Sequence, residues 1–151
     1  MNTDQVYTET TNTNLVAVYG TLRKGSGNHF LLENDESVFR GTERISGWEM
    51  FYYGSFLSFP WIKPTEDIGS SIVVEVYEVS DDVMEDLDSL EGYNPNNPKE
   101  FYDRTQVETQ HGMAWIYFME DGPKHYPIPT GDYMMPHPYK DQEYAGHEDL
   151  L

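Results

Sequence analysis

The chain contains no cysteine among its 151 residues. This absence excludes disulfide bonds, zinc sites built on thiolates and a cysteine nucleophile. The five histidines are scattered along the chain without the spacing of metal ligands, so we expect no metal site. A chain without disulfides is compatible with a reducing compartment, and we expect a cytoplasmic protein.

Basic residues are scarce. Nine Lys and Arg stand against 27 Asp and Glu, which gives a formal net charge of −18. Such a charge repels phosphate groups, so we expect neither nucleic acid nor an anionic membrane surface as a partner. The acidic residues are spread along the chain, which favours a solvated surface over a mimic of nucleic acid. No apolar run approaches the roughly 20 residues of a membrane-spanning helix.

The length is typical of one domain, which we place at residues 14–135. Residues 1–13 are polar and rich in Thr and Asn, and we expect a flexible leader there. Residues 136–151 combine prolines, tyrosines and acids, and we expect a C-terminal tail that either wraps over the surface or stays disordered. The sequence does not determine the oligomeric state, and a monomer is the simplest expectation.

Strand patterns outnumber helix patterns in the domain. The segments that carry them are residues 46–53, 72–79, 102–109 and 113–119. His111 and Gly112 form the expected hairpin turn between the last two segments. These features predict an α+β domain with a mostly antiparallel or mixed sheet.

One longer helix is predicted between two end signals. Ser80 or Asp81 is a good N-cap, and Gly92 can take the left-handed conformation that ends helices. The apolar residues between them recur at helical spacing and predict an inward stripe. They are Val83, Met84, Leu87 and Leu90.

Glu91 lies along the same stripe, four residues after Leu87. Burial disfavours its charged form, and so do the unpaired carbonyls at the end of a helix. Both effects raise the pKa of a glutamate from about 4.3 toward neutrality, where it can accept and donate a proton. The alternative is a structural carboxylate that is solvated or paired with an arginine such as Arg104.

A second informative stretch begins with an apolar run at residues 15–18, which lacks alternation and is typical of a strand buried on both faces. Gly20 then allows a tight turn or a close approach to a ligand, and successive amides in such a turn can bind an anion. An ordinary turn from strand to helix is the alternative. Residues 24–28 continue as a loop, and residues 29–33 could form a short helix. Ser26 stands where a phosphate-binding loop requires Lys.

Six short motifs occur in a fixed order over roughly residues 14–133. They are Tyr19-Gly20-Thr21-Leu22, Glu75-Val76-Tyr77, Leu87-Asp88-Ser89-Leu90-Glu91-Gly92, Tyr102-Asp103-Arg104, residues 114–117 and Gly131-Asp132-Tyr133. In this order they resemble the gamma-glutamylcyclotransferase-like family, in its branch of gamma-glutamylamine cyclotransferases and AIG2-like proteins.

The resemblance implies a small, mixed, partly closed β-barrel with a few flanking helices. It also implies an enzyme that needs no cofactor and acts on a small gamma-glutamyl substrate. Such an enzyme closes the gamma-glutamyl group to 5-oxoproline and releases the attached amine. Glu91 would act first as the general base and then as the general acid.

The resemblance implies further site residues. Backbone amides of Gly20, Thr21 and Leu22 would hold the glutamyl group and could stabilise the oxyanion. Tyr19 would form a pocket wall or donate its hydroxyl, and Tyr102 would form a second wall. His29, Pro60 and Trp61 could border the substrate, and Arg104 is expected to be structural and paired with a carboxylate.

The sequence departs from the family pattern at two places, and the second of them, together with the net charge of −18, keeps another function open. Val74 replaces a glycine that often precedes the Glu-Val-Tyr motif, and the loop at residues 94–100 is longer than usual. The alternative is a non-catalytic module that keeps the fold and binds a small metabolite or a basic protein.

Overall fold

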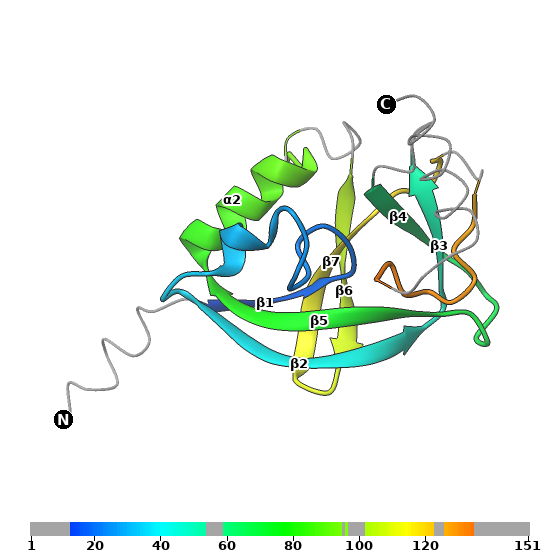
Figure 1. Ribbon diagram of the computed structural model, residues 1–151, viewed down its shortest axis with the longest axis horizontal. Helices are drawn as coiled ribbons and strands as arrows, with labels where there is room; N and C mark the ends of the chain where they lie inside the picture. The colour runs from blue at the N-terminus through cyan, green and yellow to red at the C-terminus, as the bar shows by residue number, and fades with distance from the viewer. Residues whose placement is uncertain (1–12, 54–58, 95, 97–101, 123–125, 135–151) are drawn as a thin grey trace.

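The fold is taken from a computed structural model, which describes residues 13–53, 59–94, 96, 102–122 and 126–134 (Figure 1). In chain order the elements are β1 (Thr13–Val18), the 3-10 helix η1 (His29–Leu32), β2 (Ser37–Ser46), β3 (Trp48–Tyr53), β4 (Phe59–Pro64), β5 (Ser71–Ser80), α2 (Asp81–Glu91), β6 (Asp103–Thr109) and β7 (Gly112–Phe118). The α+β class predicted from the sequence is confirmed. Apart from Thr13, the expected leader and the expected tail lie outside the described residues.

Five strands form a mixed sheet in the order β2-β5-β1-β7-β6. The pair β1–β7 is parallel, with Val16 opposite Trp115, and the other neighbouring pairs are antiparallel. The β6–β7 hairpin is present, but its turn lies at Gln110 and His111, one residue before the turn expected at His111 and Gly112, and Gly112 is the first residue of β7.

The expected closure into a partial barrel is wrong. Strands β3 and β4 form a separate two-stranded sheet, and the described strands leave β2 and β6 as the edges of an open sheet. The chain turns at Gly47, where φ is 91°. Strand β3 therefore leaves the edge of the large sheet and pairs with β4 instead of extending the ladder.

Helix α2 begins and ends where the sequence predicts. The Ser80 side chain accepts a hydrogen bond from the Val83 amide, and Gly92 follows the helix with φ of 72°. Val83, Met84 and Leu87 are buried as expected, but the inward position expected for Leu90 is wrong, because its side chain is 40% exposed. The last inward position of the helix belongs to Glu91.

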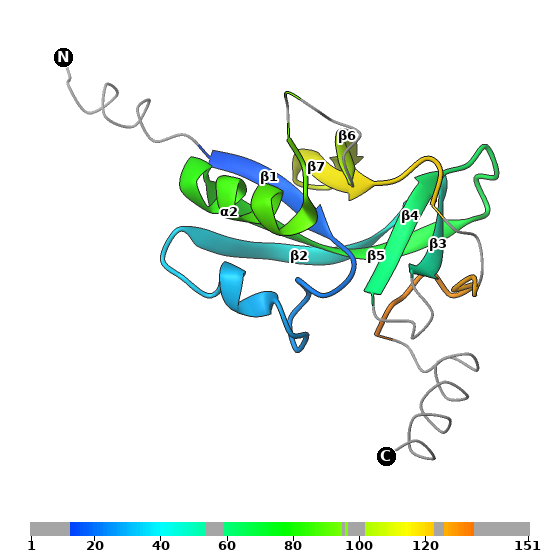
Figure 2. The same cartoon turned by 90° about the horizontal axis from the view of Figure 1, so that it is seen from above.

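Strand β1 is buried on both faces, and this explains its run of apolar residues. Val16 and Val18 belong to one core cluster with the buried residues of α2, whereas Ala17 and Tyr19 belong to a second cluster. The β3–β4 hairpin contributes to both clusters. Seen from two directions, α2 lies over one end of the large sheet and the hairpin lies toward the other end (Figures 1 and 2). The described part of the chain contains no helix that is long and apolar enough to cross a membrane.

Candidate active site

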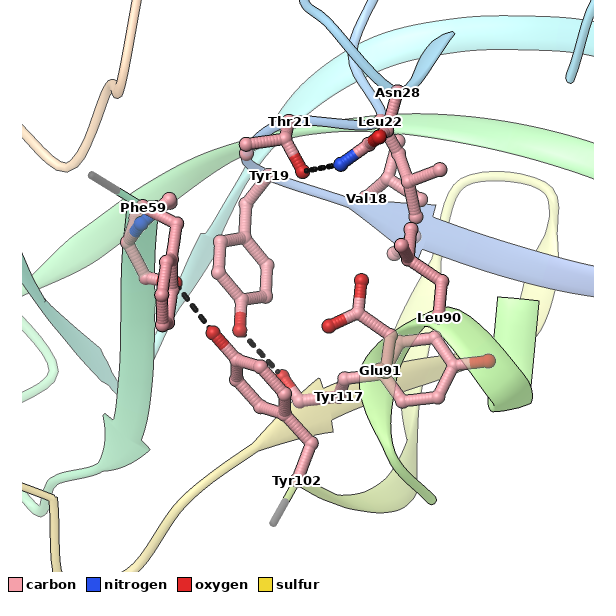
Figure 3. A pocket seen from close by; sticks show the side chains of 13 residues that line it. Val18, Tyr19, Thr21, Leu22, Asn28, Phe59, Leu90, Glu91, Tyr102 and Tyr117 are labelled. Atoms are coloured by element: carbon pink, nitrogen blue, oxygen red, sulfur yellow. Dashed lines mark hydrogen bonds between the residues drawn. The ribbon is translucent and has the colours of Figure 1, made fainter. Parts of the chain in front are cut away.

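A pocket of about 270 Å³ lies where β1, α2, β4 and β7 approach one another (Figure 3). Its walls come from four parts of the chain: the end of β1 with the following loop, the start of β4, the end of α2, and Tyr102 with β7. The lining residues are Ala17, Val18, Tyr19, Gly20, Thr21, Leu22, Asn28, Phe59, Pro60, Leu90, Glu91, Tyr102 and Tyr117.

The loop after β1 lies tightly against β4. A Cβ atom at Gly20 would lie 2.6 Å from Cγ of Pro60, so this approach requires glycine. The loop is closed by Asn28, whose amide donates to the Thr21 carbonyl at 2.9 Å. The Asn28 side chain donates to the Thr21 hydroxyl, also at 2.9 Å. These contacts fix the course of the backbone along the pocket.

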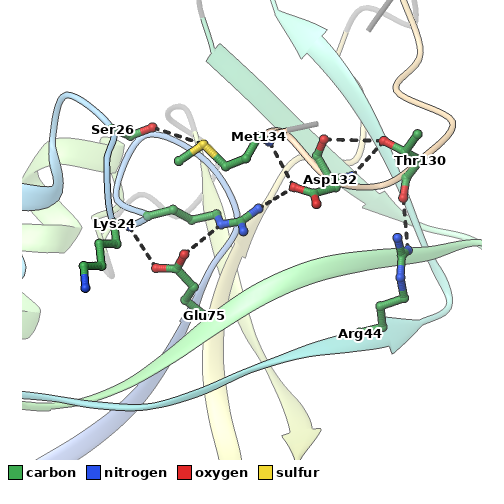
Figure 4. Close-up of polar contacts among 8 residues, drawn as sticks. Lys24, Ser26, Arg44, Glu75, Thr130, Asp132 and Met134 are labelled. Carbon is green, nitrogen blue, oxygen red and sulfur yellow. Dashed lines mark hydrogen bonds and ion pairs between the residues drawn. The ribbon is translucent and has the colours of Figure 1, made fainter. Parts of the chain in front are cut away.

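A buried ion-pair network supports the same loop from behind (Figure 4). The Arg23 guanidinium contacts Glu75 at 3.1 Å and Asp132 at 2.7 Å. Glu75 also accepts hydrogen bonds from the Lys24 amide at 2.9 Å and from the Tyr77 hydroxyl at 3.0 Å. Residues of two sequence motifs, at 75–77 and 131–133, therefore meet Arg23, which directly follows the motif at residues 19–22, in one network.

Two tyrosines form walls of the pocket, and their hydroxyls are tied to the backbone. Tyr19 donates to the Tyr117 carbonyl at 2.8 Å, and Tyr102 donates to the Pro60 carbonyl at 2.7 Å. Burial raises the pKa of both hydroxyls, so both stay protonated near neutral pH. In this arrangement each of the two hydroxyl groups donates its proton to a backbone carbonyl oxygen.

Among the described residues that line the pocket, Glu91 is the one with a carboxyl group. Its carboxylate points from the end of α2 across the pocket toward Tyr19 (Figure 3). Burial raises the pKa of Glu91 to about 8, and the negative charge of Asp88 adds to this shift. Burial of this side chain agrees with the helical spacing, whereas the influence of Asp88 was not foreseen.

Arg104 pairs with Asp88 rather than with Glu91. Its Nη1 atom lies 3.1 Å from each carboxylate oxygen of Asp88. The expected pairing of Arg104 with a carboxylate is therefore confirmed, and its partner is Asp88, while its structural role stays a prediction. The pairing leaves the carboxylate of Glu91 on the pocket side of α2.

The structure brings the predicted site residues together around this one pocket, although their roles stay predictions. They are Tyr19, Gly20, Thr21, Leu22, Glu91 and Tyr102. Pro60 also lines the pocket, but Trp61 and His29 are not among its lining residues. Trp61 is fully buried, and Nδ1 of His29 lies 2.9 Å from the Leu22 carbonyl oxygen. Sequence reasoning missed Asn28 and Phe59, because no local pattern marks a loop asparagine or a strand-end phenylalanine as pocket residues.

The lining offers a single carboxyl group that changes charge near neutral pH, surrounded by aromatic walls and by the loop that holds Gly20, Thr21 and Leu22. No lysine, arginine or histidine is among the described residues that line the pocket. Within the described ranges there is also no group of three or more His, Asp or Glu side chains that could hold a metal ion. The arrangement suits proton transfer to and from a small bound molecule.

Residues 16–135 match the family described as gamma-glutamyl cyclotransferase, AIG2-like. The chain belongs to this family. The resemblance drawn from the six motifs is therefore confirmed. The name of the family is that of an enzyme, and the class of enzyme inferred from the sequence is supported.

Relatives of this family member come from distant organisms. A protein from Drosophila melanogaster, named putative gamma-glutamylcyclotransferase, is 30% identical over 116 residues, which are 72% of this chain and 71% of that protein. A protein of the same name from Methanocaldococcus jannaschii is 33% identical over 110 residues, which are 68% of this chain and 82% of that protein.

Solved structures share the fold. A crystal structure from Pyrococcus horikoshii, of a protein described as uncharacterized, superposes with a TM-score of 0.63 at 25% identity and covers 90% of this chain and 97% of that chain. An AIG2-like protein from Mus musculus superposes with a TM-score of 0.57 at 22% identity and covers 84% of this chain and 98% of that chain.

Proposed function

We propose that the protein is a cyclotransferase that converts a gamma-glutamyl amine, or a related gamma-glutamyl conjugate, to 5-oxoproline and a free amine. The observation that carries this proposal is Glu91, a carboxyl group with a pKa of about 8 that faces a pocket of 270 Å³. The pocket is near the small end of the range for ligand sites, which suits a glutamyl group. Membership in the family supports the same reaction.

In the proposed reaction the α-amine of the glutamyl group attacks its own side-chain carbonyl carbon. A C–N bond forms to close the five-membered ring, and the C–N bond to the leaving amine breaks. The attack is intramolecular, so the enzyme has only to hold the reactive conformer and move protons. The α-nitrogen loses two protons on going from ammonium to lactam N–H, and the leaving nitrogen gains two on going from amide to ammonium. Glu91 takes one proton from the α-nitrogen and gives it to the leaving nitrogen, and the second proton is exchanged through solvent.

The loop at Gly20, Thr21 and Leu22 is proposed to hold the glutamyl group. Backbone amides in a rigid turn can bind a carboxylate or a developing oxyanion without a charged side chain. Tyr19 and Tyr102 are proposed to confine the substrate as walls. We further propose that the protein acts as a monomer in the cytoplasm.

The test is release of 5-oxoproline from a panel of gamma-glutamyl amines and gamma-glutamyl dipeptides, followed by mass spectrometry. The proposal predicts that at least one substrate yields 5-oxoproline and the free amine in equal amounts. No release from any substrate, together with binding of 5-oxoproline detected by calorimetry, would replace the enzyme with the binding module described above.

A further inference from the structure

Asp88 lies one helical turn before Glu91 on α2, at a spacing that places two side chains on the same side of a helix. Its own side chain is 18% exposed and makes three charge-assisted contacts. Arg104 donates to both of its carboxylate oxygens at 3.1 Å, and the Tyr117 hydroxyl donates to one of them at 2.8 Å. The charge of Asp88 is thus held in one place next to Glu91.

The partner of Asp88 is itself held firmly. The Arg104 guanidinium lies over the Tyr93 ring at 4.6 Å and over the Trp115 ring at 4.3 Å. Stacking between two rings limits the positions that the guanidinium can take. The cation is therefore held at Asp88, by contacts that do not involve Glu91.

The groups that face Glu91 can be named from each neighbouring element. Tyr19 from β1, Tyr102 before β6 and Tyr117 from β7 are tyrosines whose pKa is raised by burial, so they carry no charge near neutral pH. Asp88 is the anion that acts on Glu91 among the described residues. Burial raises the pKa of Asp88, while the bonds from Tyr117 and Arg104 favour its charged form.

We propose that Asp88, held by Arg104 and Tyr117, is a positioning residue that sets the pH at which Glu91 exchanges its proton. This inference rests on the proposed function of Glu91. A neighbouring negative charge makes a carboxylate a stronger base, and a stronger base takes a proton from an ammonium group more readily. The two carboxyl groups form a coupled pair, of which one holds the charge and the other moves the proton.

The test compares Asp88→Asn with the wild type and with a matched control. Asp86→Asn removes the same charge from an exposed position of the same helix. For Asp88→Asn, the acidic limb of kcat/KM against pH should move down by roughly 0.5 to 1 pH unit, because Glu91 loses a neighbouring negative charge. Asp86→Asn should keep the acidic limb of the wild-type pH profile. An acidic limb at the same pH in Asp88→Asn and Asp86→Asn would overturn the proposal.

A second variant separates electrostatics from loosened packing. Arg104→Gln removes a positive charge near the pair, so the limb should move up rather than down. A merely structural role would admit water to Glu91 and lower the midpoint in both variants. A downward shift for Arg104→Gln would contradict the proposal, and this sign decides the matter if Asp88→Asn does not fold.

The proposal can also be tested without substrate. The carboxyl carbon of Glu91 can be titrated by NMR in the ¹³C-labelled wild type and variants, with Glu91→Gln to assign the signal. The midpoint should fall in Asp88→Asn and rise in Arg104→Gln. If no substrate is turned over but these shifts appear, the proposed reaction fails while the pairing of Asp88 with Glu91 stands. If the protein turns over substrate but the midpoints do not move, the proposed reaction stands and the role of Asp88 is overturned.

Discussion

At the residue scale, Glu91 occupies a position that the helix would otherwise give to an apolar side chain. Its carboxyl group faces a pocket walled by tyrosines, next to the charge of Asp88. Burial in the pocket and the charge of Asp88 both disfavour the ionised form of Glu91. A residue held in this way destabilises the folded state when it is charged, and such residues persist where a reaction requires them.

The thermal stability of Glu91→Gln should depend on pH. The pKa of Glu91 in the folded state is raised to about 8, above its value in the unfolded chain, so the wild type loses stability as the pH rises between about 4.5 and about 8. Glutamine carries no charge and avoids this loss. The variant should therefore melt higher than the wild type by roughly 4 °C or more at pH 8, with a smaller difference at pH 5. Calorimetry at both pH values measures this.

The matched control for this measurement is Glu85→Gln, which changes an exposed carboxylate of the same helix. It should show no gain in melting temperature that grows with pH. A gain of the same size in Glu85→Gln, or a Glu91→Gln variant that gains most at pH 5, would contradict the buried state of Glu91.

At the scale of elements, the loop after β1 is held by close polar and steric contacts in addition to the burial of Leu22. Gly20 lies against Pro60 at the start of β4, and Asn28 closes the loop through two hydrogen bonds to Thr21. The proposed substrate contacts come from the backbone between these points. A small displacement of this segment therefore changes the site without changing any of its side chains.

Gly20→Ala should lower activity by about 10- to 100-fold, because its Cβ would meet Cγ of Pro60 at 2.6 Å and push the loop away from β4. Gly27→Ala is the matched control in the same loop, since a Cβ there meets nothing within 4 Å. Steady-state rates of 5-oxoproline release measure both. Similar rates for the two variants would show that the approach of the loop to β4 does not matter for the site.

At the scale of the whole molecule, Arg23 connects β5 and the segment after β7 to the loop that follows β1. Its partners Glu75 and Asp132 lie 52 and 109 residues away in the chain. A buried arginine between two carboxylates is satisfied only when all three segments are in place. The network therefore couples the shape of the site to the stability of the complete fold.

Arg23→Gln should lower the free energy of unfolding by about 3 kcal/mol, because it leaves two partly or fully buried carboxylates without their cation. Arg40→Gln breaks the ion pair between Arg40 and Glu78, in which the Arg40 side chain is 45% exposed. This variant should lower the free energy of unfolding by less than about 1 kcal/mol. Urea denaturation measures both changes. Equal losses would mean that the buried network contributes no more than a surface pair.

The sequence predicted those features that depend on local chemistry. Ser80 and Gly92 determine the ends of α2, and the spacing from Leu87 placed Glu91 on its inward side. The open sheet was not predicted, because pairing between distant strand edges leaves no local pattern. The same limit applies to Asp88: three bonds from β6 and β7 hold it, and its own position in the helix indicates only a polar side chain.

The central claim is that Glu91 moves the proton in a cyclotransferase reaction. The most direct measurement is the rate of 5-oxoproline release by the wild type and by Glu91→Gln on the best substrate of the panel, with circular dichroism to show that both are folded. The account predicts a loss of about 100- to 10,000-fold in kcat for the variant, which keeps the shape of the side chain but cannot accept a proton. A folded Glu91→Gln variant that works at the rate of the wild type would contradict it.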